Sequence, residues 1–288
     1  MNIKQFIKQI PFAISVARIF ATPVRRYSNK KILKQLENTG YDQALKIRNA
    51  IISLQQGLAQ IDQDWKDKIE SERKRLLSCN EPYYDGSLGE GGLYDHKDIS
   101  IKEACLSSIS PKKGLLLFFL TNAMKPQNVI ELGTNVGISS AYIGAALKVN
   151  RQNSKITTLD ASPYRQRLAK GLHHNLHIDN VSYIEGLFSN TLSTTLAKIG
   201  SIDLAFIDGY HQYQPTLDYF EEIMKYSSPS IAFIFDDIRW SDGMKKAWSR
   251  IQSDERIGLV VDLYSVGICT RRQHDNYQRF VFDPIYIF

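Results

Sequence analysis

The sequence of 288 residues predicts an α/β fold in which helices cover both faces of a mostly parallel sheet. Short apolar runs alternate with helical patterns beyond Pro111, which is the spacing of strands joined by crossover helices. A glycine-bearing turn follows the first of these runs, and acidic residues follow several later ones. Such turns gather at the carboxyl ends of parallel strands, where open α/β sheets bind their ligands.

The expected parallel strands lie at residues 128–132, 155–160, 181–185, 202–208 and 230–235. Two further strand-like runs, 259–264 and 266–270, are joined by so short a link that only an antiparallel hairpin fits. We therefore expect a seven-stranded sheet that finishes in a C-terminal hairpin. The aromatic-rich end, residues 280–282 and 285–288, is interpreted as an edge strand or a subunit contact.

The chain divides into three regions by pattern. Apolar residues recur at helical spacing from Lys30 to about Leu77, so residues 1–80 are predicted to be a helical cap or dimerisation region. Residues 81–104 contain a Gly-rich stretch without periodicity, which we interpret as a connector or a loop. The α/β domain is expected over residues 105–288.

Composition is that of an ordinary globular protein, with 43% hydrophobic residues. The net charge of +6 is spread along the chain, which favours solvated helix faces over a nucleic-acid surface. Three widely separated cysteines form no C-x-x-C pair, so neither a disulfide framework nor a zinc site is indicated and a cytoplasmic location is expected.

An apolar segment at residues 10–24 is interrupted by Pro11, Arg18 and Pro23. It lacks the uninterrupted span of about 20 apolar residues that crosses a bilayer. We predict an amphipathic helix that packs on the protein or on a second subunit, with peripheral membrane contact as the alternative.

The glycine turn lies in the run V-I-E-L-G-T-N-V-G-I-S at residues 129–139. Gly133 and Gly137 would let the backbone approach a ligand closely. Asn135 and Ile138 stand where a dinucleotide fingerprint has its second and third glycines, so a pyrophosphate cradle is not expected.

Carboxylates follow three of the predicted strands. Asp160 ends the second strand, where it can accept hydrogen bonds from ribose hydroxyls or cap the helix that follows. Asp208 and His211 follow the fourth strand, and Asp236 and Asp237 follow the fifth. If these last two strands are neighbours, three carboxylates converge and need compensation by protons or by a cation, and oxygen ligands of this kind suit Mg²⁺.

A second group of titratable residues lies on a predicted crossover helix. His173 and His177 are four residues apart, but no H-E-x-x-H glutamate accompanies them. We interpret these two residues and His174 as surface residues rather than metal ligands.

These motifs together resemble a known family. Glu131 to Ser139, the I-D-G-x-H run at 207–211 and the F-D-D-I-x-W-S-x-G-M run at 235–244 are similar to bacterial class I S-adenosylmethionine (SAM) dependent methyltransferases of the "methyltransferase domain 24" type. That family is similar in turn to catechol and caffeoyl-coenzyme A O-methyltransferases. The resemblance covers roughly residues 105–283 and implies a Rossmann-like fold.

The resemblance also implies roles for particular residues. Gly186 and Leu187 would line the adenine, and the full set of expected SAM contacts is Glu131, Gly133, Thr134, Asn135, Gly137, Ser139, Asp160, Ala161, Gly186, Leu187 and Asp208. Asp208, Asp236 and Asp237 would bind a divalent cation. His211 stands where the animal catechol enzymes have a lysine base, so it is expected to act with Asp208 as base, metal ligand or hydrogen-bond donor.

The function expected from these features is a magnesium-assisted O-methyltransferase that acts, as a homodimer, on a small hydroxylated acceptor of secondary or cell-surface metabolism. A metal-independent N- or O-methyltransferase is one alternative, and a SAM-binding partner protein without turnover is another. An NAD-dependent oxidoreductase would also use Asp160, but the missing glycines count against it.

Overall fold

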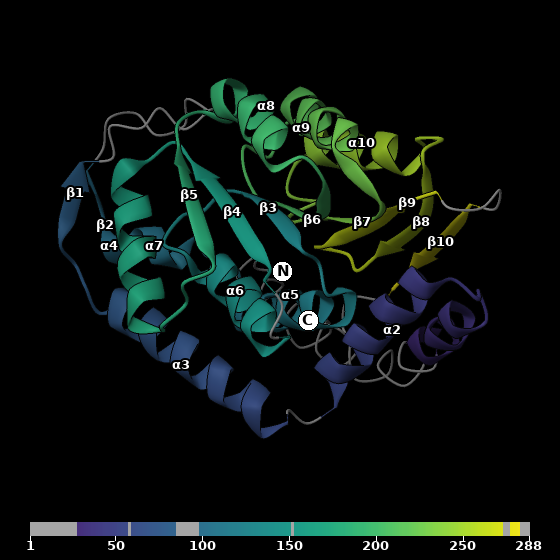
Figure 1. Ribbon diagram of the computed structural model, residues 1–288, viewed down its shortest axis with the longest axis horizontal. Coiled ribbons are helices and arrows are strands. Elements are labelled where there is room, and N and C mark those ends of the chain that lie inside the picture. The colour runs from purple at the N-terminus through teal and green to yellow at the C-terminus, as the bar shows by residue number, and fades with distance from the viewer. Residues whose placement is uncertain (1–27, 57–58, 85–97, 151–152, 273–276, 283–288) are drawn as a thin grey trace, which may run out of the picture.

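The computed structural model describes residues 28–56, 59–84, 98–150, 153–272 and 277–282. An eight-stranded sheet runs through it in the order β10-β8-β9-β7-β6-β3-β4-β5 (Figure 1). The strands of this sheet are β3 (Asn128–Leu132), β4 (Lys155–Asp160), β5 (Val181–Glu185), β6 (Ile202–Ile207), β7 (Ser227–Phe235), β8 (Ile257–Asp262), β9 (Gly267–Arg271) and β10 (Gln278–Val281).

The direction of the strands confirms the predicted fold class. Strands β3 to β7 pair in parallel, whereas β9 is antiparallel to both β7 and β8. The expected C-terminal hairpin is therefore β8–β9. The sheet has one strand more than the seven expected, because β10 pairs in parallel with β8 and forms the edge that the aromatic-rich end predicted.

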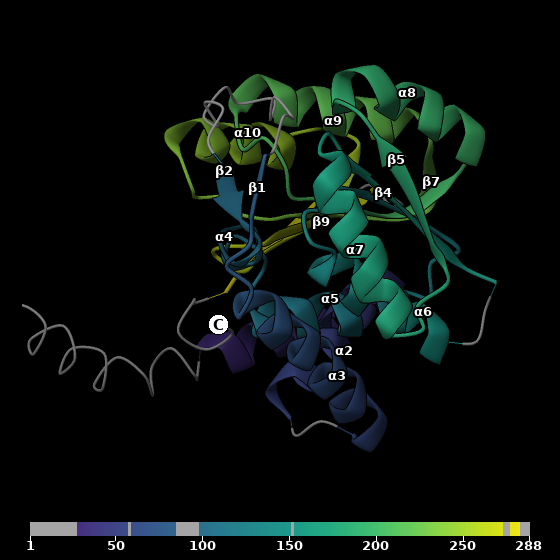
Figure 2. The ribbon, with the colours of Figure 1, turned by 90° about the vertical axis from the view of Figure 1, so that its left-hand side faces the viewer.

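Helices cover both faces of the sheet (Figure 2). One face carries α8 (Phe188–Ile199), α9 (Tyr213–Lys225) and α10 (Asp242–Gln252). The other carries α5 (Pro111–Met124), α6 (Ile138–Val149) and α7 (Pro163–Asn175). Alternate residues of each strand enter the two cores. In β6, for example, Leu204 and Phe206 pack on the side of α5 and α6, whereas Ala205 and Ile207 pack on the side of α8 to α10.

The described part of the N-terminal region is mostly helical, as its periodicity predicts. Residues 28–37 are helical and are followed by α2 (Asp42–Gln55) and α3 (Gln60–Leu77). Helices α2 and α3 lie against the outer side of α5 and α6 (Figure 2). Buried residues of α2 and α3 belong to the same apolar core as those of α5 and α6.

Two short strands and a helix connect this region to the sheet. Strands β1 (Pro82–Tyr84) and β2 (Asp98–Ser100) pair antiparallel, and α4 (Ile101–Leu106) begins directly after β2. The Gly-rich stretch between the two strands and the apolar segment at residues 10–24 lie outside the described residues. Among the helices that are described, none combines the length and the apolar character needed to cross a membrane.

Serine residues start three helices that border the carboxyl edge of the sheet. Ser110 caps α5, Ser162 caps α7 and Ser241 caps α10, and each side chain accepts a hydrogen bond from a backbone N–H in the first turn. Pro111 and Pro163 follow two of these caps at a position where a helix needs no N–H donor. Local sequence therefore determines where these helices begin.

Candidate functional site

The carboxyl ends of the central strands are level with one another. Leu132 at the end of β3 pairs with Leu159 of β4 and with Ile207 of β6, and Ile207 pairs with Phe235 of β7. The two strands that precede the expected acids, β6 and β7, are neighbours, as the convergence of those acids requires. The turns that follow β3, β4, β6 and β7 consequently meet at one edge of the sheet.

The glycines of the first turn are required by the protein's own packing. Gly133 has φ +104°, and a Cβ atom there would lie 2.2 Å from the backbone oxygen of Asp208. Gly137 has φ +87°, and its Cβ would lie 2.8 Å from the Cβ of Ala169. Both positions therefore need glycine because neighbouring segments approach them closely, before any ligand is considered. Direct contact of the turn with a ligand stays a prediction.

Glu131 supports this turn from beneath. Its side chain is wholly buried, and its Oε2 accepts a hydrogen bond of 2.5 Å from the Thr158 hydroxyl. The Thr134 hydroxyl lies 2.6 Å from that of Thr158, and it donates when the Thr158 proton is directed at Glu131. Burial raises the pKa of Glu131 to about 7, with neighbouring hydroxyls opposing the shift. Its Oε1 has no hydrogen-bond partner among the described residues.

Asp160 joins the first turn to the second. Its two carboxylate oxygens accept hydrogen bonds from the backbone N–H of Asn135, at 2.8 Å, and of Ser162, at 2.9 Å. The alternative prediction that Asp160 caps the next helix is wrong, because Ser162 caps α7 with its own side chain. Asp160 is 8% exposed and stands at the expected place, as the last residue of β4. The half-buried Ala161 follows it.

The remaining expected SAM contacts lie on the same edge. Gly186 follows β5 with φ +134°, and its N–H donates to the backbone oxygen of Asp160 at 3.0 Å. Leu187 is the N-cap residue of α8. The side-chain amide of Asn135 donates to the backbone oxygen of Ala104, so it holds the end of α4 against the turn. Ser139 is buried in the first turn of α6.

His173 contradicts the expectation that the three α7 histidines are surface residues. Its side chain is 1% exposed, and its Nε2 lies 2.9 Å from the backbone oxygen of Gly137. Its Nδ1 lies 2.6 Å from the Tyr183 hydroxyl. Burial lowers the pKa of His173 to about 4, so the ring is neutral, donating to Gly137 and accepting from Tyr183. His174 and His177 are exposed, as expected.

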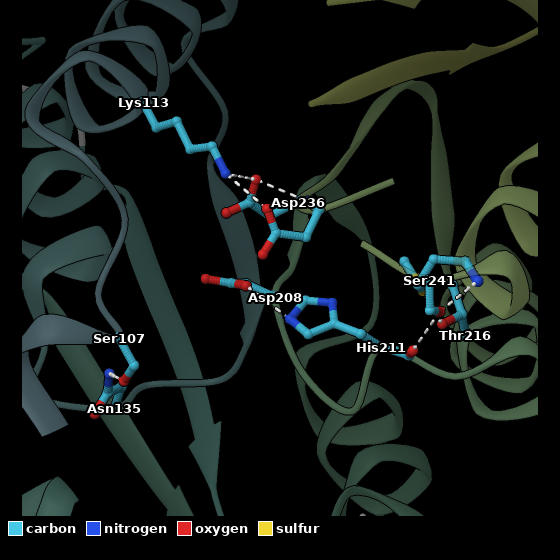
Figure 3. A network of polar contacts seen from close by, with 10 residues as sticks. Ser107, Lys113, Asn135, Asp208, His211, Thr216, Asp236 and Ser241 are labelled. Atoms are coloured by element: carbon cyan, nitrogen blue, oxygen red, sulfur yellow. Dashed lines mark hydrogen bonds and ion pairs between the residues drawn. The ribbon is translucent and has the colours of Figure 1, made fainter. Parts of the chain in front are cut away.

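An acid and base cluster lies where β6 and β7 end (Figure 3). The Nε2 of His211 is 3.5 Å from Asp208 Oδ1. The Nζ of Lys113, on α5, is 2.5 Å from Asp236 Oδ1 and 2.9 Å from Asp237 Oδ1. The side chain of Asp236 is 4% exposed, that of Lys113 17% and that of Asp237 33%. Three acids and two basic groups therefore share one partly buried site.

Burial and charge act in opposite directions on these groups. Burial and the neighbouring Asp208 charge raise the pKa of Asp236, and the Lys113 ammonium opposes that rise. Burial alone would lower the pKa of Lys113 and of His211. The charge and hydrogen bonding of Asp236 nevertheless keep the Lys113 pKa above its ordinary value, and Asp208 does the same for His211. Lys113 is thus a permanent cation at neutral pH.

The expected divalent metal does not fit this donor set. The structure brings Asp208, Asp236 and Asp237 to one edge, but the ammonium of Lys113 already binds the two acids that follow β7. Within the described ranges, no group of three or more His, Cys, Asp or Glu side chains is arranged to hold a metal ion. The compensating cation that the acids require is instead a lysine from α5.

A partly buried ion pair holds the loop after β7. The Arg239 guanidinium donates two hydrogen bonds of 2.8 Å to the carboxylate of Asp262, which has no exposed surface. The indole N–H of Trp248 donates to the same carboxylate at 3.0 Å. Hydrogen bonding to Arg239 therefore keeps the pKa of Asp262 below its ordinary value despite burial. This network fixes the segment that carries Asp236 and Asp237 to β8 and α10.

Sequence reasoning missed Lys113, His173 and this ion pair. A local signal existed for Lys113, because Ser110 and Pro111 indicate a helix start and place the lysine in its first turn. That signal does not say which part of the sheet the turn faces. Its partner Asp236 is 123 residues away along the chain.

The central segment of the chain is similar to known proteins. Residues 130–238 match the family described as "Methyltransferase domain". A putative O-methyltransferase from Mycobacterium sp. (strain JLS) is 32% identical over 110 residues, which cover 38% of this chain and 48% of that protein. A catechol O-methyltransferase from Niastella koreensis is 26% identical over 133 residues, covering 46% and 58%. The chain thus spans about half the length of these curated relatives.

Solved structures agree on the fold. A methyltransferase from Podospora anserina, bound to S-adenosylhomocysteine (SAH), superposes with a TM-score of 0.55 at 18% identity, covering 76% of this chain and 90% of that one. At this level of identity the likeness concerns the fold alone. The predicted Rossmann-like class I methyltransferase fold is confirmed. Residues 130–238, which match the methyltransferase family, include the glycine turn and the acids Asp208, Asp236 and Asp237.

Proposed function

We propose that this protein is a SAM-dependent O-methyltransferase that acts on a small hydroxylated acceptor. The observation that carries the proposal is the Asp208–His211 pair at the end of β6, beside the glycine turn of a segment that matches a methyltransferase family. A carboxylate and an imidazole in contact form a proton acceptor of the kind that a hydroxyl substrate needs. Relatives named as O-methyltransferases support oxygen as the acceptor atom.

SAM would be held along the edge formed by the turns after β3, β4 and β5. Gly133 to Gly137 would face its amino-acid part, Asp160 its ribose and the Gly186–Leu187 turn its adenine. The unpartnered Oε1 of Glu131 provides a buried acceptor beneath the first turn. When bound, SAM supplies a methyl group attached to a positively charged sulfur. The sulfur is a good leaving group for in-line displacement because it departs as a neutral thioether.

The chemical step assigns one role to each of two residues. His211 takes the proton of the acceptor hydroxyl, and Asp208 orients the imidazole and stabilises its charged form. SAM would supply the methyl group: the acceptor oxygen would bond to the methyl carbon, the carbon–sulfur bond would break, and its electron pair would stay on the sulfur of SAH. The proton leaves on His211 and passes to solvent.

Metal dependence is the part of the expected function that the site does not support, because Lys113 binds Asp236 and Asp237. Turnover in the presence of excess EDTA would agree with the arrangement of these residues. Loss of turnover in EDTA with recovery in Mg²⁺ would restore the metal-dependent alternative. N-methylation is separated from O-methylation by a panel of matched amine and hydroxyl acceptors.

The first test is calorimetric titration of the purified protein with SAH, run with and without Mg²⁺ and beside an NAD control. We expect binding of SAH in the micromolar range and none of NAD. Asp160→Ala should weaken SAH binding by at least about tenfold, because the turns after β3 and β4 lose their shared acceptor. Asp218→Ala, at an exposed position on α9, is the matched control.

Two outcomes would contradict the proposal in different ways. Absence of SAH binding by the folded protein would remove the methyltransferase assignment and leave only a fold. SAH binding without methyl transfer to any hydroxyl or amine acceptor would favour a SAM-binding partner protein without turnover.

A further inference from the structure

We propose that Lys113 is a built-in counter-cation for Asp236 and Asp237 and excludes a divalent metal from this site. The inference concerns the site of the proposed function and rests on it for the consequence that methyl transfer proceeds without a resident metal. The observation behind this proposal is that Lys113 Nζ contacts one oxygen of each acid.

Asp236 and Asp237 already have a cation, the Lys113 ammonium, at hydrogen-bonding distance. The ammonium lies 2.5 Å from Asp236 and 2.9 Å from Asp237, which are distances of direct charge-assisted hydrogen bonds. A divalent ion bound by the same two oxygens would have to displace Lys113 or stand beside it. If the metal ion displaced Lys113, the lysine side chain, which is 17% exposed, would lose its carboxylate partners. If the metal ion bound beside Lys113, the two positive charges would repel each other.

The position of Lys113 is set by rigid elements. It lies in the first turn of α5, and its own N–H donates to the Ser110 side chain that caps the helix. The residues that follow it in α5, from Gly114 to Thr121, are all buried. Asp236 is held equally firmly, because its N–H donates to the backbone oxygen of Ile207 and its carboxylate accepts the N–H of Asp237. The contact therefore joins two fixed backbones.

The chemistry of an ammonium also differs from that of a metal in the proposed reaction. Lys113 balances the negative charge of the acids, which would otherwise repel the hydroxyl oxygen of the acceptor as it loses its proton. Unlike a metal ion, the ammonium offers no open coordination position. Deprotonation of the acceptor then depends on His211 alone. A lysine cannot be removed by a chelator, so the charge balance of the site is independent of metal supply.

The test compares Mn²⁺ binding, followed by electron paramagnetic resonance, in the wild type, Lys113→Met and Lys112→Met. Lys112 is the adjacent exposed lysine and serves as the matched control. We expect the wild type and Lys112→Met to show no site with a Kd below about 1 mM, because the acids are already paired. Lys113→Met should bind Mn²⁺ at least about tenfold more tightly, because it removes the competing charge.

Lys113→Arg provides a conservative variant that keeps the charge and should keep the low Mn²⁺ affinity. A micromolar Mn²⁺ site in the wild type that disappears in Asp236→Asn would overturn the proposal. Equal Mn²⁺ affinity in Lys113→Met and Lys112→Met would also overturn it. If Lys113→Met does not fold, the wild-type titration alone decides, and SAH calorimetry reports separately on the proposed function.

Discussion

Burial determines the charge of the residues that surround the glycine turn. His173 is neutral because burial lowers its pKa to about 4, and Glu131 holds a proton up to near neutrality because burial raises its pKa to about 7. The His173 ring contacts the turn at the backbone oxygen of Gly137, and the Glu131 carboxylate is linked to Thr134 of the turn through the Thr158 hydroxyl. Protonation at this site therefore couples the stability of the protein to pH.

The first prediction concerns His173. Its pKa falls from 6.5 in the unfolded chain to about 4, so the unfolded state binds more protons between these values and stability falls as the pH is lowered through this range. The loss amounts to about 3 kcal/mol at most. His173→Gln should abolish this contribution, whereas His174→Gln, at an exposed position, should retain it. Urea unfolding of the three proteins at pH 7 and pH 5 measures the difference, and identical pH dependence in all three would contradict it.

The second prediction concerns the proposed base. His211 must be neutral to accept a proton, and Asp208 raises its pKa above 6.5. Turnover should therefore decrease as the pH falls through that raised pKa. His211→Gln should reduce kcat by about 10²–10⁴-fold with SAH affinity unchanged. Asp208→Asn should lower kcat and move the acidic limb of the pH profile to lower pH. A His211→Gln enzyme with full turnover would exclude this histidine as the base.

At the scale of elements, the turn after β3 owes its shape to the ends of both neighbouring strands, β4 and β6. Its first two N–H groups donate to the backbone oxygen of Leu159, and the backbone of Asp208 fills the space that a side chain at residue 133 would need. The glycine turn, Asp160 and the Asp208 region are thus one packed unit. A substitution that distorts the turn should therefore disturb the acid cluster as well as the residues that are expected to bind SAM.

The third prediction compares two glycines. Gly133→Ala places a Cβ 2.2 Å from a backbone oxygen at φ +104°, so it should destabilise the fold by about 3 kcal/mol and abolish SAH binding. Gly171→Ala lies in α7 with no atom within 4 Å of the new Cβ, and it should stabilise the protein by about 0.5–1 kcal/mol. Denaturant unfolding and calorimetry measure both effects. A Gly133→Ala protein with wild-type SAH affinity would show that the turn tolerates a side chain.

At the scale of the whole molecule, the N-terminal helices share the core of the α/β domain. Ile47 and Ile51 of α2, and Ile69 and Leu76 of α3, are buried in the cluster that also contains residues of α5 and α6. The described part of residues 28–80 therefore packs as an integral layer of the fold. Their predicted role in a homodimer stays a prediction, as do the cytoplasmic location and the absence of a nucleic-acid partner.

The fourth prediction tests this shared core. Ile51→Ala removes a side chain with no exposed surface and should lower the free energy of unfolding of the entire protein by about 2–5 kcal/mol. Ile61→Ala, at a site that is 52% exposed, should change it by less than about 0.5 kcal/mol. Circular dichroism and tryptophan fluorescence should follow a single coincident transition in both variants. Two separate transitions in Ile51→Ala would show that the N-terminal helices unfold as an independent domain.

Local patterns determined most of the fold. Apolar runs with turn residues at their ends predicted the parallel strands β3 to β7 and the β8–β9 hairpin, because strand burial and turn chemistry depend on neighbouring residues. The same locality placed Gly133, Asp160, Asp208 and Asp236 at the ends of strands. Whether those carboxylates and glycines contact SAM stays a prediction.

The tertiary structure alone decided what surrounds these residues. His173 belongs to a helix with mixed polarity, and only its packing against Gly137 makes it a buried support. Lys113 looks like any lysine in a first helical turn, yet it contacts acids 123 and 124 residues away. The sequence by itself thus determined the strands, their turns and the acids at the edge. The cation that balances those acids depends on how α5 packs across the sheet, because charge compensation requires proximity in space and carries no signature in sequence spacing.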